Sequence, residues 1–288
     1  MVLEHIFPED WLERKGRYAF LLGVGYSIIG ILLAKILFPN DPALVAVAIT
    51  SLLLLPELYK IFSIEERQES MEQNVSFGAL WRDDAGVVRI YIFLFLGIIL
   101  VYSLGTLILP DFQSNSLFRQ QLEVRYGAGN VGHAFSTDLF IDLVSNNFLV
   151  LIACFIIALL TGDGAIFLIA WNASVWGTIF GVTARNAAQF SGQNHFYLFG
   201  IIMLVVFPHM ILEAIAYFLA AISGSVVSKD VLLERFASDR FLEVFGFNLY
   251  LLLFGLIFLV LGALVETWVL NNVAIYQTII QLSMHLPG

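Results

Sequence analysis

Apolar residues in this chain fall in long blocks separated by short polar breaks. Each block is about 20 residues long or more, which is the length an α-helix needs to cross about 30 Å of hydrocarbon. The second block is the least regular, because Pro56 and Glu57 interrupt it and Lys60 ends it. Seven blocks meet the criterion, at about 18–38, 43–62, 90–109, 138–160, 165–184, 197–223 and 242–270. The pattern predicts an all-α fold, a multi-span transmembrane helical bundle of about seven spans.

Composition narrows the class of protein further. Hydrophobic residues make up 59% of the 288 and charged residues only 13%, against about 45–50% and about 25% in globular proteins. With 14 basic and 23 acidic residues the formal net charge is −9, so the chain lacks the basic footprint of a nucleic-acid-binding protein. The partner that composition predicts is the lipid bilayer, and not a nucleic acid.

The distribution of Lys and Arg predicts the orientation of the spans. Ten of the 14 lie in segments on the same side as the N-terminus, and basic residues are enriched on the cytoplasmic side of membrane proteins. We therefore expect the N-terminus inside, the C-terminus outside, and a multi-pass protein of the cell (plasma) membrane.

Two polar breaks separate the early spans. The inner one, 63–89, is predicted either as a charged helix on the bilayer surface or as a solvated connector. The outer one, 110–137, holds an amphipathic stretch around Phe118, then Gly127 to Gly132 in a G-x-G-x-x-G pattern. No βαβ unit surrounds that pattern, so we interpret it as a hinge and not as a dinucleotide site.

Polar side chains within the later spans are the candidate functional residues. Hydrocarbon makes such residues costly unless they face another helix or water. They are two amides in span four, one in span five and three neighbouring residues in span six: Asn146, Asn147, Asn172, Pro208, His209 and Glu213.

His209 and Glu213 are four residues apart and share a helix face. Pro208 frees a backbone carbonyl and should kink the helix beside them. An ionised acid at this depth costs on the order of 3 kcal/mol, so Glu213 should be protonated, paired with His209, or in contact with water. A structural lock and a functional site both remain open for this pair, and each amide can serve as a clamp between helices.

Small residues predict how the later spans pack. Asn248, Gly255, Gly262 and Glu266 follow one another at spacings of seven, seven and four in span seven, which permits close approach of another helix. We expect residues 138–288, with spans four to seven, to form the core bundle. Residues 1–137, with spans one to three and both polar breaks, should pack around or beside it.

The sequence predicts no enzyme, metal or cofactor. The His-x-x-x-Glu pair supplies two ligands and the H-E-x-x-H signature is missing. Cys154, the single cysteine, has no assigned base and is expected to act as a small hydrophobic residue.

At these residues the chain resembles the stage II sporulation protein M family of prokaryotic membrane proteins, in an archaeal-type form. The resemblance rests on Asn146-Asn147, on Asn172 within AWNASVWG, and on Pro208-His209 with Glu213, and it covers about 138–224. Ala173 and Met210 stand where the family usually has glycine. It implies five spans, a membrane location and a role in organising partner proteins, with the first two or three helices as an added or divergent module.

Two functions follow from this pattern. The leading hypothesis is a non-enzymatic membrane protein that organises or anchors a complex with membrane-protein partners. The alternative is an ion- or proton-coupled transporter or channel that uses the intramembrane His/Glu/Asn cluster. Homodimerisation through the glycine stripes is compatible with both.

Overall fold

The computed structural model describes residues 16–71, 77–127, 137–233 and 239–284, all of it helical apart from short connections. The helices, in chain order, are α2 (Gly16–Leu37), α3 (Pro42–Met71), α4 (Phe77–Ile108), α5 (Asp111–Leu117), α6 (Arg119–Gly127), α7 (Thr137–Thr161), α8 (Ile166–Ser191), α9 (His195–Leu233), α10 (Asp239–Asn272) and α11 (Ala274–Met284). The all-α prediction is confirmed.

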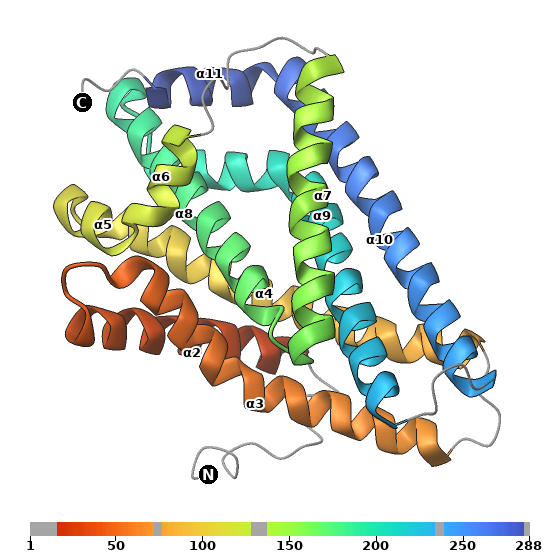
Figure 1. Ribbon diagram of the computed structural model, residues 1–288. Helices are drawn as coiled ribbons and strands as arrows, with labels where there is room; N and C mark the ends of the chain where they lie inside the picture. The colour runs from red at the N-terminus through yellow and green to blue at the C-terminus, as the bar shows by residue number, and fades with distance from the viewer. Residues whose placement is uncertain (1–15, 72–76, 128–136, 234–238, 285–288) are drawn as a thin grey trace.

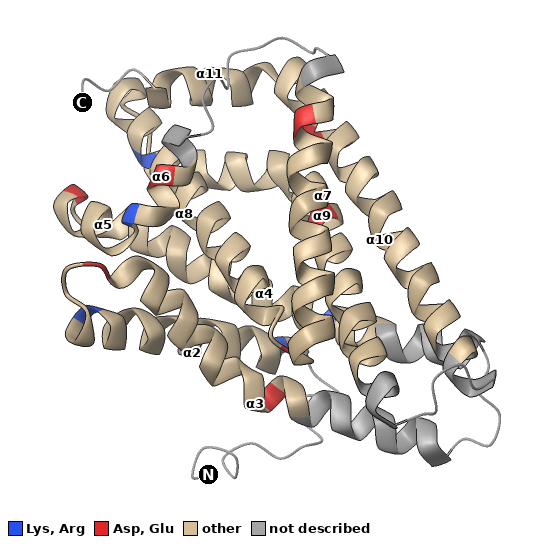
Figure 2. Cartoon of the chain, viewed as in Figure 1, with Lys and Arg blue, Asp and Glu red and all other residues tan. Residues whose placement is uncertain are grey.

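Seven helices within the described ranges are long and apolar enough to cross a membrane. They are α2, α3, α4, α7, α8, α9 and α10, and their apolar segments match the seven predicted blocks to within a few residues at most ends. Figure 2 shows these helices largely free of charge, with an acidic position midway along α9. The charge-free lengths fit a membrane interior, where ionisable groups are rare.

The bundle consists of two groups of helices joined through α8. In one group α9 packs against α10 and α7, and in the other α2 packs against α3 and α4. Figure 1 shows α7, α9 and α10 running alongside one another, while α2 and the first part of α3 lie at the lower left of the view. Because α8 contacts α4 as well as α9, it holds the two groups together.

Helix α4, the third span, is closely packed against the later helices. The most apolar window of α8 is 67% buried and that of α4 is 56% buried, against 22% for α7. In α4, Tyr91 stacks on Phe218 of α9 with ring centroids 5.3 Å apart. Gly177 of α8 lies so close to α4 that a Cβ there would be 2.6 Å from the carbonyl oxygen of Ile99. The third span, α4, therefore packs closely against spans five and six.

The inner polar break does not form a separate surface helix. Instead α3 continues to Met71 and α4 begins at Phe77, so the charged residues extend two spanning helices. Pro56 lies inside α3 without ending it, as membrane helices tolerate when neighbouring groups satisfy the freed carbonyl. The side chains of residues 60–84 lie outside the part of the chain that the structure describes.

The outer break folds into α5 and α6, which pack onto the ends of the spans. Leu117, Phe118 and Leu122 of the predicted amphipathic stretch are all buried. Gln121 of α6 is buried as well, and its Nε2 donates to the carbonyl of Ala43 at 3.4 Å and to the hydroxyl of Ser174 at 3.3 Å. This side chain thus ties α6 to both α3 and α8. Apart from Gly127, the glycine-rich segment lies outside the described residues.

A short helix after the last span was not predicted. Helix α11 packs mainly against α8 and lies across the upper end of the bundle in Figure 1. It buries Ile279 and Ser283, while Ile275 is half exposed. This division into a packed and an open face suits a helix lying at the membrane surface.

Candidate functional site: an intramembrane carboxyl pair

Glu213 lies in the seam between α9 and α10. The residue is only 3% exposed, because the side of α10 that faces it carries glycine. A Cβ at Gly262 would be 2.7 Å from Cγ of Glu213 and 3.4 Å from the carbonyl oxygen of His209. The absence of a side chain at position 262 thus makes room for the carboxyl group between the two helices.

The carboxyl group of Glu213 lies close to two polar side chains from other helices. One is the carboxyl group of Glu266 on α10, and the other is the amide of Asn147 on α7. An ionised carboxylate only accepts hydrogen bonds, so the two carboxyl groups can bond to each other only when one of them carries a proton.

His209 contributes to the same seam without pairing with the acid. It is 6% exposed, and within the described part of the chain its Nδ1 has no hydrogen-bond partner. The Oε1 atom of Glu213 is likewise buried and without a partner there. Of the three states predicted for Glu213, pairing with His209 is thus not the one seen, and the nearby side chains are Glu266 and Asn147.

The six predicted site residues are only partly brought together. Asn147 and Glu213 are in contact, and His209 lies on the same seam. Asn146 is exposed, although its Nδ2 lies 3.4 Å from the Oδ1 of Asn147. Asn172 donates to the carbonyl of Leu168 in its own helix at 2.8 Å.

Pro208, the sixth predicted residue, is exposed within α9. Figure 1 shows α9 changing direction between its first part, which runs across the bundle, and the remainder beside α7 and α10. A proline inside a helix removes a backbone hydrogen bond and produces such a bend.

Glu266 is the member of the site that the sequence analysis missed. Its stripe was recognised, and the structure places that stripe against α9: a Cβ at Gly255 would lie 3.1 Å from the carbonyl of Ala216, and Ser223 donates to the carbonyl of Asn248 at 2.8 Å. The position of an acid on a glycine stripe was therefore the sequence signal that could have identified Glu266 as a site residue. These glycines pack against α9 within the chain. They are therefore covered and do not offer a surface to a second copy.

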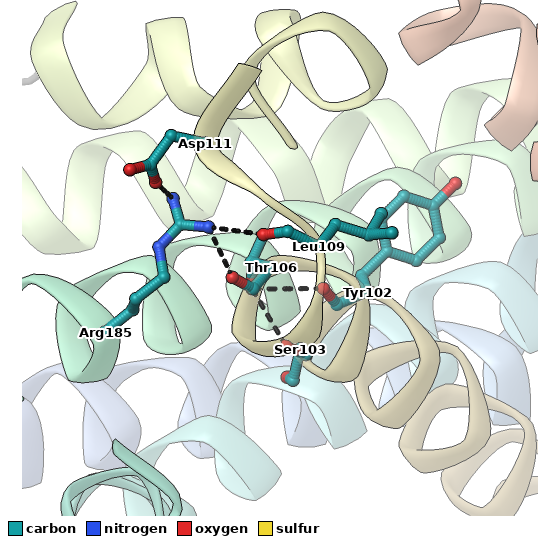
Figure 3. Close-up of polar contacts among 6 residues, drawn as sticks. All are labelled: Tyr102, Ser103, Thr106, Leu109, Asp111 and Arg185. Atoms are coloured by element: carbon teal, nitrogen blue, oxygen red, sulfur yellow. Dashed lines mark hydrogen bonds and ion pairs between the residues drawn. The ribbon is translucent and has the colours of Figure 1, made fainter. Parts of the chain in front are cut away.

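A second polar cluster closes the end of α4 (Figure 3). Arg185 of α8 is largely buried and donates through Nη1 to the carbonyls of Thr106 at 2.8 Å and Leu109 at 3.1 Å. Its Nη2 lies 2.7 Å from the Oδ1 of Asp111. These carbonyls belong to the last turn of a helix, where the backbone lacks intrahelical donors. Arg185 therefore caps α4 and ties α5 to the bundle.

The ligand set of the seam suits protons better than a transition metal. Throughout the ranges that the structure describes, no three His, Cys, Asp or Glu side chains form a group that could hold a metal ion. The seam offers two carboxyl groups and one amide, and both carboxyl groups interact electrostatically with Tyr217. Two carboxyl groups from separate helices can exchange one proton.

The fold and this site define an all-α, multi-span membrane protein. It belongs to the SpoIIM family: the family model described as Stage II sporulation protein M matches residues 19–269. No curated protein and no solved structure matched the chain. The resemblance found in the sequence is confirmed, but its extent is corrected. The match begins within the first span, so the early helices belong to the family region and are not an added module.

Proposed function

We propose that this protein is a multi-pass protein of the plasma membrane without enzymatic activity. It acts as a proton-coupled transporter or channel, in which protons move through the Glu213–Glu266 pair. The observation that carries the proposal is the close approach of two carboxyl groups from different helices at membrane depth. Ionisable groups inside the membrane are costly and commonly mark proton or ion pathways.

Three features of the seam support a proton-handling role. The pair joins α9 to α10, so gain or loss of its proton changes the attraction between two helices. Oε1 of Glu213 and Nδ1 of His209 are buried polar atoms that the described part of the chain leaves without partners, and such atoms call for a functional explanation. The bend of α9 at Pro208 lies one residue before His209. A bent helix can change the access of the seam to either side.

A flux measurement tests this proposal. The full-length protein is reconstituted in liposomes that contain a pH-sensitive dye, and a potassium diffusion potential drives protons inward. We expect proton uptake above that of empty liposomes, and its loss in both Glu213→Gln and Glu266→Gln. Glu123→Gln is the matched control, because Glu123 is an exposed acid on α6. Uptake equal to that of empty liposomes, or equal uptake in all variants, would refute the proposal.

A second candidate function is the organisation of a membrane complex, which the family resemblance implies. The observation that favours it is the outward face of α7, where Asp142, Ser145 and Asn146 are exposed. Polar groups at this depth favour contact with another helix. Site-specific photocrosslinking from position 146 in native membranes tests this candidate. A reproducible adduct with one defined protein would support it, and the lack of any adduct would count against it.

A further inference from the structure

Helix α7 is the spanning helix least covered by the rest of the chain. Only 22% of its most apolar window is buried, and three polar residues of the helix are exposed, namely Asp142, Ser145 and Asn146. Asn146 lies seven residues into the apolar segment that begins at Leu139, about 10 Å along the helix axis. An amide at that depth is unfavourable when it faces acyl chains alone.

The outward residues of α7 follow a seven-residue repeat. Asp142, Leu149 and Ile156 are spaced by seven, and Asn146, Ala153 and Leu160 occupy the position four residues after each of them. Leu149 is 68% exposed and Ile156 is 45% exposed. Apolar residues at this spacing form the seam of a left-handed helix pair, which crosses at about 20°.

We propose that this seam on α7 packs against α7 of a second copy of the chain, about a two-fold axis normal to the membrane. Such an axis keeps the two helices parallel, as identical topology requires, and brings the same residues face to face. An amide carries both a donor and an acceptor, so Asn146 is complementary to itself. The small side chain of Ala153 allows close approach.

Other parts of the structure favour this surface over the glycine stripe of α10. Gly255 and Gly262 already contact α9, whereas the α7 seam has no covering helix on its outward side among the described residues. Asp142 lies one turn nearer the start of the span than Asn146, where two like charges can remain in contact with water. The neighbouring amides Asn146 and Asn147 thus face in different directions, one toward the seam and one toward Glu213.

Cysteine crosslinking in native membranes tests the pairing. The variant Asn146→Cys is made in a Cys154→Ala background, because Cys154 is the only native cysteine and is fully buried. Mild oxidation should link two copies at position 146, since a two-fold axis places equivalent residues within disulfide distance. Leu204→Cys is the control, because Leu204 is 79% exposed on α9, away from the seam.

The outcomes separate pairing from chance encounter. A dimer formed at position 146 and not at 204 supports the proposal. Equal linkage at both positions, no linkage at 146, or linkage only to a different protein overturns it. In a background that retains Cys154, Asn146→Leu should raise the dimer dissociation constant in detergent by about three-fold, and at most about twenty-fold. An unchanged dissociation constant would also overturn the proposal. None of these measurements depends on proton flux, so their failure leaves the proposed function standing.

Discussion

Replacing Gly262 by alanine should separate α10 from α9 at the carboxyl pair. The added Cβ would lie 2.7 Å from Cγ of Glu213 and 3.4 Å from its backbone nitrogen, so either the side chain or the helix must move. Forcing an additional methyl group into a packed interface costs about 1–3 kcal/mol. Alanine also favours the helix over glycine by about 1 kcal/mol, which partly offsets that cost.

A glycine-to-alanine substitution elsewhere in α10 controls for the gain in helix propensity. A Cβ at Gly246 would meet nothing within 4 Å, so Gly246→Ala gains the helix propensity without the steric cost. Reversible unfolding in mixed micelles should therefore place Gly262→Ala about 1–3 kcal/mol below Gly246→Ala in the free energy of unfolding. Equal stability of the two variants would show that α10 does not approach Glu213 as closely as the structure has it.

Three further substitutions probe the polar contacts by the same unfolding assay. Arg185→Leu should cost about 2 kcal/mol or more, because two carbonyl groups lose their donor, whereas Asp111→Asn should cost under about 1 kcal/mol because that carboxylate is exposed; equal costs would contradict the capping role. Glu266→Leu should cost about 0.6–1.7 kcal/mol and Glu266→Gln less, since an amide can still donate to Glu213; a leucine variant as stable as the glutamine variant would refute the contact. Asn172→Ala should cost under about 0.5 kcal/mol because its amide bonds only within its own helix, and a loss above 1 kcal/mol would reveal an interhelical role.

The spans could be predicted because hydrocarbon imposes a length and an apolar composition on each of them. The pattern is local, so the block at 90–109 needed no knowledge of its neighbours to be recognised as a helix. The position of that helix in the bundle is not local. Nothing in the segment indicates that Tyr91 and Ile99 face two other helices, and the third span was therefore placed outside the core.

The candidate site was predictable to the extent that it depends on one helix. The four-residue spacing of His209 and Glu213 correctly places them on one face of α9, but the partner of the acid depends on which helix crosses that face. Glu266 and Asn147 are 53 and 66 residues away from Glu213 in sequence. Spacing within a helix does not encode such a contact, although the glycines beside Glu266 indicated which face of α10 would be covered.

The burial of Gln121 has a consequence for the order in which the chain assembles. Its partner Ser174 is 53 residues further along, and at about 5–20 residues per second the ribosome needs about 3–10 s to synthesise that interval. During this time α6 has left the translocation channel while its docking place on α8 does not yet exist. The segment must wait at the membrane surface, without the partner that ties Gln121 to α8, until the fifth span enters the bilayer.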